Sequence, residues 1–308
     1  MSEYIRWESV IPNFQEGDII TPFGSNIQRM RDNDPGWDGG LPNHCGSIEE
    51  LASVKRKSSQ KVGVYAPNGV QILPEEFDEC KVHIYKIPDF YGSGIRVKKQ
   101  GLYGLYDSKG KMIVPPQYNW VEFEYNVIIV RIDKGEDSFY GVYSADGKEI
   151  IKCEYDYINY WGSIDRGDGY AIVRKNRLSG VISETGKQII PCKFKCVRPR
   201  EAFRYQGYIV TDATNLNGWY SRDGRFNIPC KFENFEFFNW FEDYLPATHI
   251  EVKTPQGLKG IYSFEGNEIA PPKFESFQHI GNYMVGLIGK DKLSVYDKDG
   301  VCVYQTAE

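Results

Sequence analysis

The sequence predicts an all-β protein built from seven antiparallel repeats of about 40 residues each. A glycine, replaced once by serine, is followed two residues later by an aromatic residue or isoleucine and six residues later by a second glycine. In the first six copies an aromatic residue also follows the first glycine after fourteen positions, and the copies start 34 to 42 residues apart. This period is typical of propellers and solenoids. The first positions are Gly63, Gly104, Gly141, Gly180, Gly218, Gly260 and Ser294, and the second glycines are Gly69, Gly110, Gly147, Gly186, Gly224, Gly266 and Gly300.

Each repeat has the pattern of three short strands followed by a fourth apolar segment. In the fourth copy, residues 170–175, 179–186 and 187–194 are short β-rich pieces bounded by turn residues. The second glycine follows residues such as Asp146 or Asn68, the composition of a tight hairpin where φ turns positive. In five of the first six copies, a proline lies three positions before the aromatic residue that follows the first glycine by fourteen positions. Proline has no backbone N–H to donate to a β-ladder, so it marks an edge strand or a strand end. A final segment such as 274–277 then leads to the next repeat.

The repeats predict either a closed seven-bladed β-propeller, which we favour, or an open β-solenoid. The last copy lacks its proline and aromatic, and residues 10–14 echo residues 189–194 with one residue deleted. We therefore expect residues 1–14 to form an N-terminal strand that closes the last repeat, since closure removes an exposed sheet edge. Residues 15–46 are expected to be a loop insertion, and residues 47–308 the seven repeats, all in one domain.

These paired glycines and Pro-x-x-aromatic endings resemble the WG β-repeat family, over about residues 51–303. The family is named for a Trp-Gly pair at the first glycine. This chain departs from that pattern, because the preceding residue is Val62, Tyr103, Tyr140, Ser179, Asn217, Lys259 or Leu293. The resemblance implies a bacterial interaction module rather than an enzyme, and it brings no catalytic residues.

Charge and composition narrow the functional classes. The formal net charge is −5, which repels nucleic-acid backbones at long range, so we expect no nucleic-acid partner. No stretch approaches eighteen apolar residues, and we expect no membrane association. Three of the seven cysteines share one repeat position with Pro116 and Pro272, which favours space-filling free thiols in a reducing cytoplasm.

The insertion at residues 15–46 is the first candidate partner site, because loops on a rigid scaffold often carry function. Its candidate contact residues are Arg29, Arg31, Trp37 and Asp38, with the tryptophan as anchor. Asp32, Asp34 and Asp38 form a weak candidate Ca²⁺ loop. The bidentate glutamate of such loops is absent, and an ordinary solvated loop is favoured over a metal site.

A second candidate lies in residues 232–244, where seven of thirteen residues are aromatic. Phe237, Trp240 and Phe241 are the candidate contact residues there, because neighbouring positions on an extended strand point to opposite faces. The alternative interpretation is that these rings pack between blades.

The leading hypothesis is a non-catalytic scaffold that presents loops from successive repeats to a protein partner, without a cofactor. The four histidines occupy unrelated repeat positions, and no nucleophile or phosphate-binding motif is present. Two alternatives remain open. One is a propeller hydrolase or lyase that uses carboxylates at a central pocket. The other is a module that binds a carbohydrate or small ligand through exposed aromatic residues.

Overall fold

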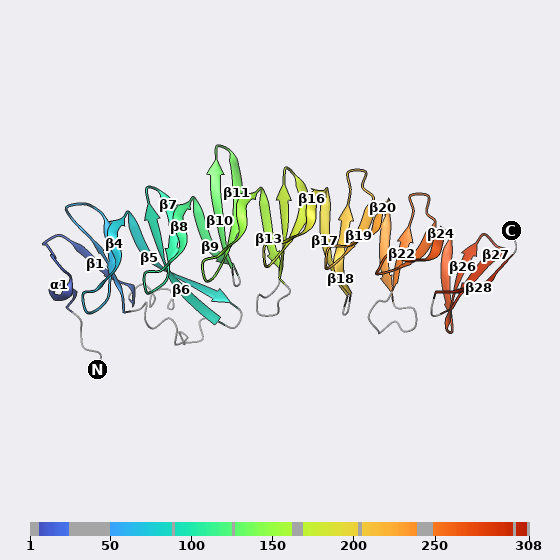
Figure 1. The fold of residues 1–308 in the computed structure, drawn as a ribbon, viewed down its shortest axis with the longest axis horizontal. Coiled ribbons are helices and arrows are strands. Elements are labelled where there is room, and N and C mark those ends of the chain that lie inside the picture. Colours follow the sequence, from blue (N-terminus) through green and yellow to red (C-terminus); the bar gives the residue numbers. More distant parts are fainter. Residues whose placement is uncertain are drawn as a thin grey trace. The chain divides into compact units, whose positions relative to one another are not determined.

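The computed structural model confirms the all-β repeat class, with seven four-stranded antiparallel sheets (Figure 1). It describes residues 6–24, 50–87, 90–124, 127–161, 169–202, 205–238, 249–297 and 300–306. Each sheet is formed by four strands that are consecutive in the chain. Closure of the seven sheets into a ring stays a prediction.

The chain divides into two compact units near residue 157, and the first unit holds three sheets. A short helix, α1 (Trp7–Val10), precedes them. Their strands are β1 (Ile19–Pro22), β2 (Ala52–Lys55), β3 (Val62–Tyr65) and β4 (Gln71–Phe77); β5 (Glu79–Ile87), β6 (Phe90–Lys99), β7 (Leu102–Tyr106) and β8 (Met112–Tyr118); β9 (Trp120–Glu124), β10 (Val127–Lys134), β11 (Asp137–Ser144) and β12 (Glu149–Tyr155).

The second unit holds the other four sheets. Their strands are β13 (Tyr157–Trp161), β14 (Tyr170–Lys175), β15 (Leu178–Ser183) and β16 (Gln188–Phe194); β17 (Cys196–Ala202), β18 (Tyr205–Thr211), β19 (Asn217–Ser221) and β20 (Phe226–Phe232); β21 (Asn234–Phe238), β22 (His249–Lys253), β23 (Lys259–Ser263) and β24 (Glu268–Phe274); β25 (Ser276–Ile280), β26 (Tyr283–Ile288), β27 (Lys292–Tyr296) and β28 (Cys302–Gln305). The apolar segment that ends each sequence repeat is therefore the first strand of the next sheet.

The two glycines of a repeat have separate structural roles. In the second sheet, Gly110 has φ +84° in the hairpin between β7 and β8, as predicted from its turn composition. The first glycine, Gly104, lies under an irregular part of β8, where a Cβ would be 2.7 Å from the Pro116 nitrogen. The ladder shifts register there, since Tyr103 pairs with Tyr118 while Leu105 pairs with Val114. The interval of fourteen residues between Gly104 and Tyr118 therefore includes a β-bulge, and the backbone of the bulge leaves no room for a Cβ at Gly104.

Side chains that alternate along the strands form a core between consecutive sheets within each unit. Between the second and third sheets, Leu105 and Val114 pack against Val121, Ile128 and Val130. Between the fifth and sixth sheets the core is more aromatic, with buried side chains Trp219, Ile228, Phe232, Phe235, Ile250, Val252, Tyr262 and Phe264. A sheet with a neighbour on each side within its unit thus buries both faces, which explains the β-branched and aromatic residues on its strands.

The N-terminal segment differs from the strand that the sequence predicted. Residues Trp7–Val10 are helical, and the last sheet is formed entirely by β25–β28. Ile11 instead packs against Val54 and Tyr65 of the first sheet. Gly69 approaches the Val10 carbonyl there, just as Gly110 approaches the Ile72 carbonyl two residues before a proline. Residues 10–14 resemble the end of a repeat, and they pack against the first sheet in the way that the end of a preceding repeat would.

A buried arginine, Arg56, binds the N-terminal segment to the first sheet. Arg56 is buried, and its guanidinium donates to the Pro12 carbonyl at 2.7 Å and the Asn13 carbonyl at 3.2 Å. It also pairs with the carboxylates of Asp18 at 2.9 Å and Glu75 at 2.6 Å. The residues from 15 onward are likewise not all insertion, because β1 is the first strand of the first sheet. A first strand is needed there to complete the same four-stranded pattern.

Cysteines that share a repeat position fill space beside a strand. The Cys153 thiol donates to the Phe139 carbonyl at 2.9 Å, and the Cys230 thiol lies 4.0 Å from the Val210 carbonyl. Burial raises the pKa of each thiol to about 11, so both are protonated at neutral pH.

No helix in the described ranges is long and apolar enough to span a membrane.

Candidate functional site

Of the candidate contact residues, Phe237 lies in a cleft between the fifth and sixth sheets. Arg29, Arg31, Asp32, Asp34, Trp37, Asp38, Trp240 and Phe241 lie outside the described residues. Their roles therefore stay predictions. Among the residues that the structure does describe, no group of His, Cys, Asp or Glu could hold a metal ion.

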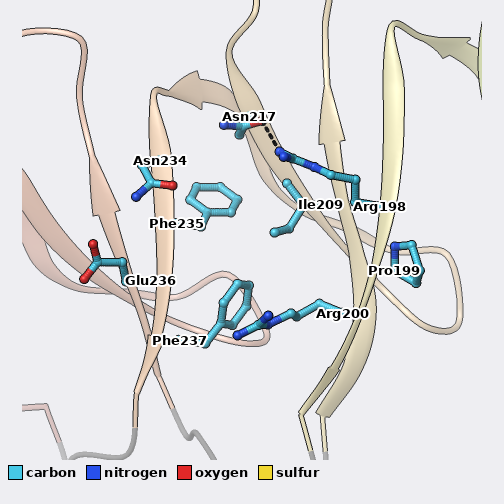
Figure 2. A pocket seen from close by; sticks show the side chains of 9 residues that line it. All are labelled: Arg198, Pro199, Arg200, Ile209, Asn217, Asn234, Phe235, Glu236 and Phe237. Atoms are coloured by element: carbon cyan, nitrogen blue, oxygen red, sulfur yellow. Dashed lines mark hydrogen bonds between the residues drawn. The ribbon is translucent and has the colours of Figure 1, made fainter.

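The cleft lies between strands β17 and β21, which are edge strands of neighbouring sheets in the second unit (Figure 2). Its volume is about 540 Å³, within the range of pockets that bind small molecules or peptide side chains. The lining residues are Arg198, Pro199, Arg200, Ile209, Asn217, Asn234, Phe235, Glu236 and Phe237.

One wall of the cleft is cationic because of the alternation along β17. Arg198 and Arg200 are two residues apart, so both project from the same face of the strand. Arg198 pairs with Ile209 across the ladder, and Arg200 pairs with Gly207. Figure 2 shows both guanidinium groups directed into the space between the two sheets.

A buried asparagine positions one of these arginines. Arg198 donates to the Asn217 Oδ1 at 3.3 Å, and the Thr211 hydroxyl donates to the same oxygen at 2.8 Å. The Asn217 amide donates in turn to the Glu233 carbonyl at 2.8 Å. Asn217 is 8% exposed, and its hydrogen bonds hold its amide in one orientation. The network therefore holds part of the Arg198 guanidinium while its other N–H groups remain available.

The opposite wall is aromatic. Phe235 is buried and Phe237 is half-buried, and both come from the same face of β21. The Phe237 ring lies 5.4 Å from the Trp219 ring and 6.0 Å from the Phe264 ring, centroid to centroid. The Arg200 guanidinium lies over the Phe237 ring at 5.1 Å from its centroid. Packing between sheets therefore accounts for Phe232, Phe235 and Phe237, while Phe237 also contributes to the cleft surface.

The cleft is lined by Asn217, which stands at the position where the WG-repeat pattern has its tryptophan. Asn217 directly precedes the first glycine of its repeat, where the second sheet has Tyr103. Tyr103 is half-buried and packs against the core between the second and third sheets, as does Phe123. Phe123 lies in β9 at the place that Phe237 has in β21. The fifth sheet thus has the smaller asparagine side chain where the second sheet has a tyrosine, and this asparagine lines the cleft.

The described lining of the cleft contains one carboxylate, that of Glu236. Glycoside hydrolysis uses two facing carboxylates. Glu236 alternates with Phe235 and Phe237, and Figure 2 shows it on the side of β21 away from the arginines. Sequence reasoning missed Arg198, Arg200 and Asn217. The sequence pattern that could have indicated them is a pair of arginines at i and i+2 on the first strand of a sheet. In the same sheet, the residue before the first glycine is the small, polar Asn217.

Solved structures with similar chains were found at low identity. One is a eukaryotic initiation factor, with 8% identity, 87% of this chain and 76% of that chain covered, and a TM-score of 0.32. Another is AztD from Citrobacter koseri, with 13% identity, 87% and 84% covered, and a TM-score of 0.26. BamB from Moraxella catarrhalis has 11% identity, 82% and 77% covered, and a TM-score of 0.25. No curated protein matches the sequence.

A family model described as WG containing repeat matches residues 103–135 and 140–178. The matches begin at Tyr103 and Tyr140, each followed by the first glycine of a repeat. This confirms the resemblance inferred from the glycine spacing. Each matched segment joins the hairpin of one sheet to the first two strands of the next. Residues 103–135 and 140–178 of this chain are therefore similar to the WG-containing repeat.

Proposed function

We propose that this chain is a non-catalytic binding scaffold that presents the cleft between β17 and β21, together with loops of successive repeats, to a protein partner. The observation that carries the proposal is the cleft itself, where one repeat has Asn217 at a position that a ring fills in the second sheet. Stacked sheets with shared cores form a rigid support, which lowers the entropic cost of binding at such a cleft.

The lining of the cleft is that of a peptide-recognition surface. An aromatic wall supplies apolar contact area, and Arg198 and Asn217 supply polar groups that can orient a ligand. Arginine and aromatic residues are also the types enriched at binding hot spots. We further propose a cytoplasmic location. The free cysteines of the described residues support it, because disulfides are rare in the reducing cytoplasm.

A peptide selection tests the scaffold function. The full chain is immobilised and used to select binders from a random peptide library, and enriched peptides are measured in solution by fluorescence anisotropy. We expect a recurring sequence pattern with micromolar affinity, and we expect Asn217→Tyr to weaken its binding by filling the cleft.

A glycan and metabolite panel, read out by tryptophan fluorescence, is run beside the selection. Failure of the library to yield any peptide that binds in solution, with saturable binding of a glycan or metabolite instead, would refute the proposal. The chain would then be a small-ligand module.

A further inference from the structure

We infer that the cleft between β17 and β21 binds an acidic peptide segment, with two glutamates at positions i and i+2 held by Arg198 and Arg200. This inference rests on the proposed scaffold function and names the chemistry of its ligand. It is carried by the charge of the cleft, the spacing of its arginines and the aromatic wall beside them.

The two arginines lack a carboxylate partner within the described part of the chain. Their contacts there are the Asn217 Oδ1 for Arg198 and the Phe237 ring for Arg200. Two other described arginines do have such a partner: Arg131 pairs with Asp133 and Arg225 pairs with Asp223, both at 2.9 Å. Two neighbouring guanidinium groups without an anion repel each other, and a ligand that supplies carboxylates relieves this repulsion.

The spacing of the arginines matches an extended peptide. Residues i and i+2 of a strand lie on one face, about 7 Å apart. A bound segment in extended conformation has the same periodicity, so two acidic side chains separated by one residue project toward the two arginines. Each planar guanidinium can bind a carboxylate through two parallel N–H···O hydrogen bonds. The remaining contacts of Arg198 and Arg200 reduce the freedom that these side chains lose on binding.

The aromatic wall favours glutamate over aspartate. Phe237 is half-buried and lies directly under the Arg200 guanidinium, so a ligand carboxylate that meets Arg200 must approach along the ring. The two methylenes of a glutamate can cover the exposed part of this ring, whereas aspartate has one. Glu236 points to the other face of β21 and does not neutralise the arginine wall.

Binding of a defined peptide tests the inference. The probe is a blocked, fluorescein-labelled peptide of glycine and serine that carries two glutamates separated by one alanine. Its matched control has glutamine at both positions. Anisotropy titrations with the full chain should show binding of the glutamate peptide that weakens as salt is added. The glutamine peptide should bind at least about tenfold more weakly, as expected for the loss of charge-assisted hydrogen bonds.

Variants locate the site. The double variant R198A/R200A should lose about tenfold or more in affinity for the glutamate peptide. Arg225→Ala is the matched control: it also removes one exposed arginine of the same sheet, and its affinity should stay within about twofold of wild type. Arg198→Lys keeps the charge but loses the planar fork, and should weaken binding by an intermediate factor.

Three results would overturn the inference: equal binding of the two peptides, unchanged affinity of R198A/R200A, or arginine-dependent binding of inorganic phosphate or a single-stranded oligonucleotide in place of the peptide. Its failure is distinguishable from failure of the scaffold function. Library-selected peptides that bind the chain independently of both arginines would leave the scaffold proposal standing and remove this one.

Discussion

Replacement of Arg56 by alanine should loosen the N-terminal segment from the first sheet. The Arg56 side chain is 11% exposed and makes two hydrogen bonds to the carbonyls of Pro12 and Asn13 and two ion pairs to Asp18 and Glu75. The Asp18 side chain is 1% exposed, so the variant leaves a buried carboxylate without its cation. Breaking a buried ion pair from one side costs about 3–5 kcal/mol.

We expect the measured loss near the lower end, about 3 kcal/mol, because the segment can lift away and let water reach Asp18. Urea unfolding followed by circular dichroism measures the free energy of unfolding, and hydrogen exchange locates the change. Exchange should rise over residues 7–20 and stay unchanged in the second unit, since repeat units interact with their neighbours only.

The pH dependence gives an independent check. The backbone N–H of Lys57 is the main cause that lowers the pKa of Asp18, and the Arg56 guanidinium adds to it. Because the folded pKa lies below its ordinary value of 3.8, this contribution is present above that pH and is lost as the pH falls through the folded pKa. Without Arg56 the pKa of Asp18 rises, so acid loosening of the segment should begin at a higher pH.

Lys57→Ala is the control for this prediction. Lys57 is exposed and adjacent to Arg56, and its backbone N–H to Asp18 is kept in the variant. It should change the free energy of unfolding by less than about 0.5 kcal/mol. If the free energy of unfolding of Arg56→Ala lies within about 1 kcal/mol of the wild-type value and hydrogen exchange over residues 7–20 is unchanged, Arg56 does not hold the N-terminal segment on the first sheet.

Three further predictions follow from other parts of the molecule. Gly110→Ala should cost about 2 kcal/mol or more in urea unfolding, because φ is +84° and the new Cβ would lie 2.5 Å from the Ile72 carbonyl oxygen. Gly135→Ala, at φ +66° with open space around it, should cost only about 1 kcal/mol, and equal costs would contradict the role of close approach. Asn217→Tyr should abolish binding of the glutamate peptide while circular dichroism shows a folded chain, with a stability loss of about 1–2 kcal/mol from the hydrogen bond to the Glu233 carbonyl; retained binding would contradict the cleft assignment. Burial lowers the pKa of His249 from 6.5 to about 4, so the unfolded state binds the proton first and stability should fall as pH drops from about 6.5 to about 4, by about 2–3 kcal/mol. His249→Gln should flatten this slope in chemical denaturation series, and an unchanged slope would exclude His249 as its source.

The fold was largely predictable because its determinants are local. The glycine at the hairpin needs a positive φ, as at Gly110, and the glycine fourteen residues before the aromatic needs space under a bulge, as at Gly104. Both requirements recur at fixed spacing in the first six repeats. The N-terminal segment was misassigned because residues 10–14 look like a repeat ending wherever they pack. A sequence echo shows which kind of surface the segment fits, and the position of that surface is a tertiary property.

The candidate site was less predictable because it depends on what two sheets leave empty between them. Arg198 and Arg200 read as ordinary exposed strand residues, and Asn217 reads as a simple departure from a family pattern. Phe237 was singled out from its aromatic neighbours, but its contacts with Trp219 and Phe264 come from residues 18 and 27 positions away in the chain.

By itself, the sequence determined the all-β class, the number of repeats, the hairpin in each and the family that two of them match, because periodic spacing directly encodes local backbone geometry. Only the tertiary structure decided that each repeat ends in the first strand of the following sheet, that the N-terminal segment covers the first sheet, and that a cationic cleft opens beside Asn217. The reason is that packing depends on side-chain volumes contributed from separate strands. A missing ring at one position becomes a cavity only when the opposite wall does not move in to fill it.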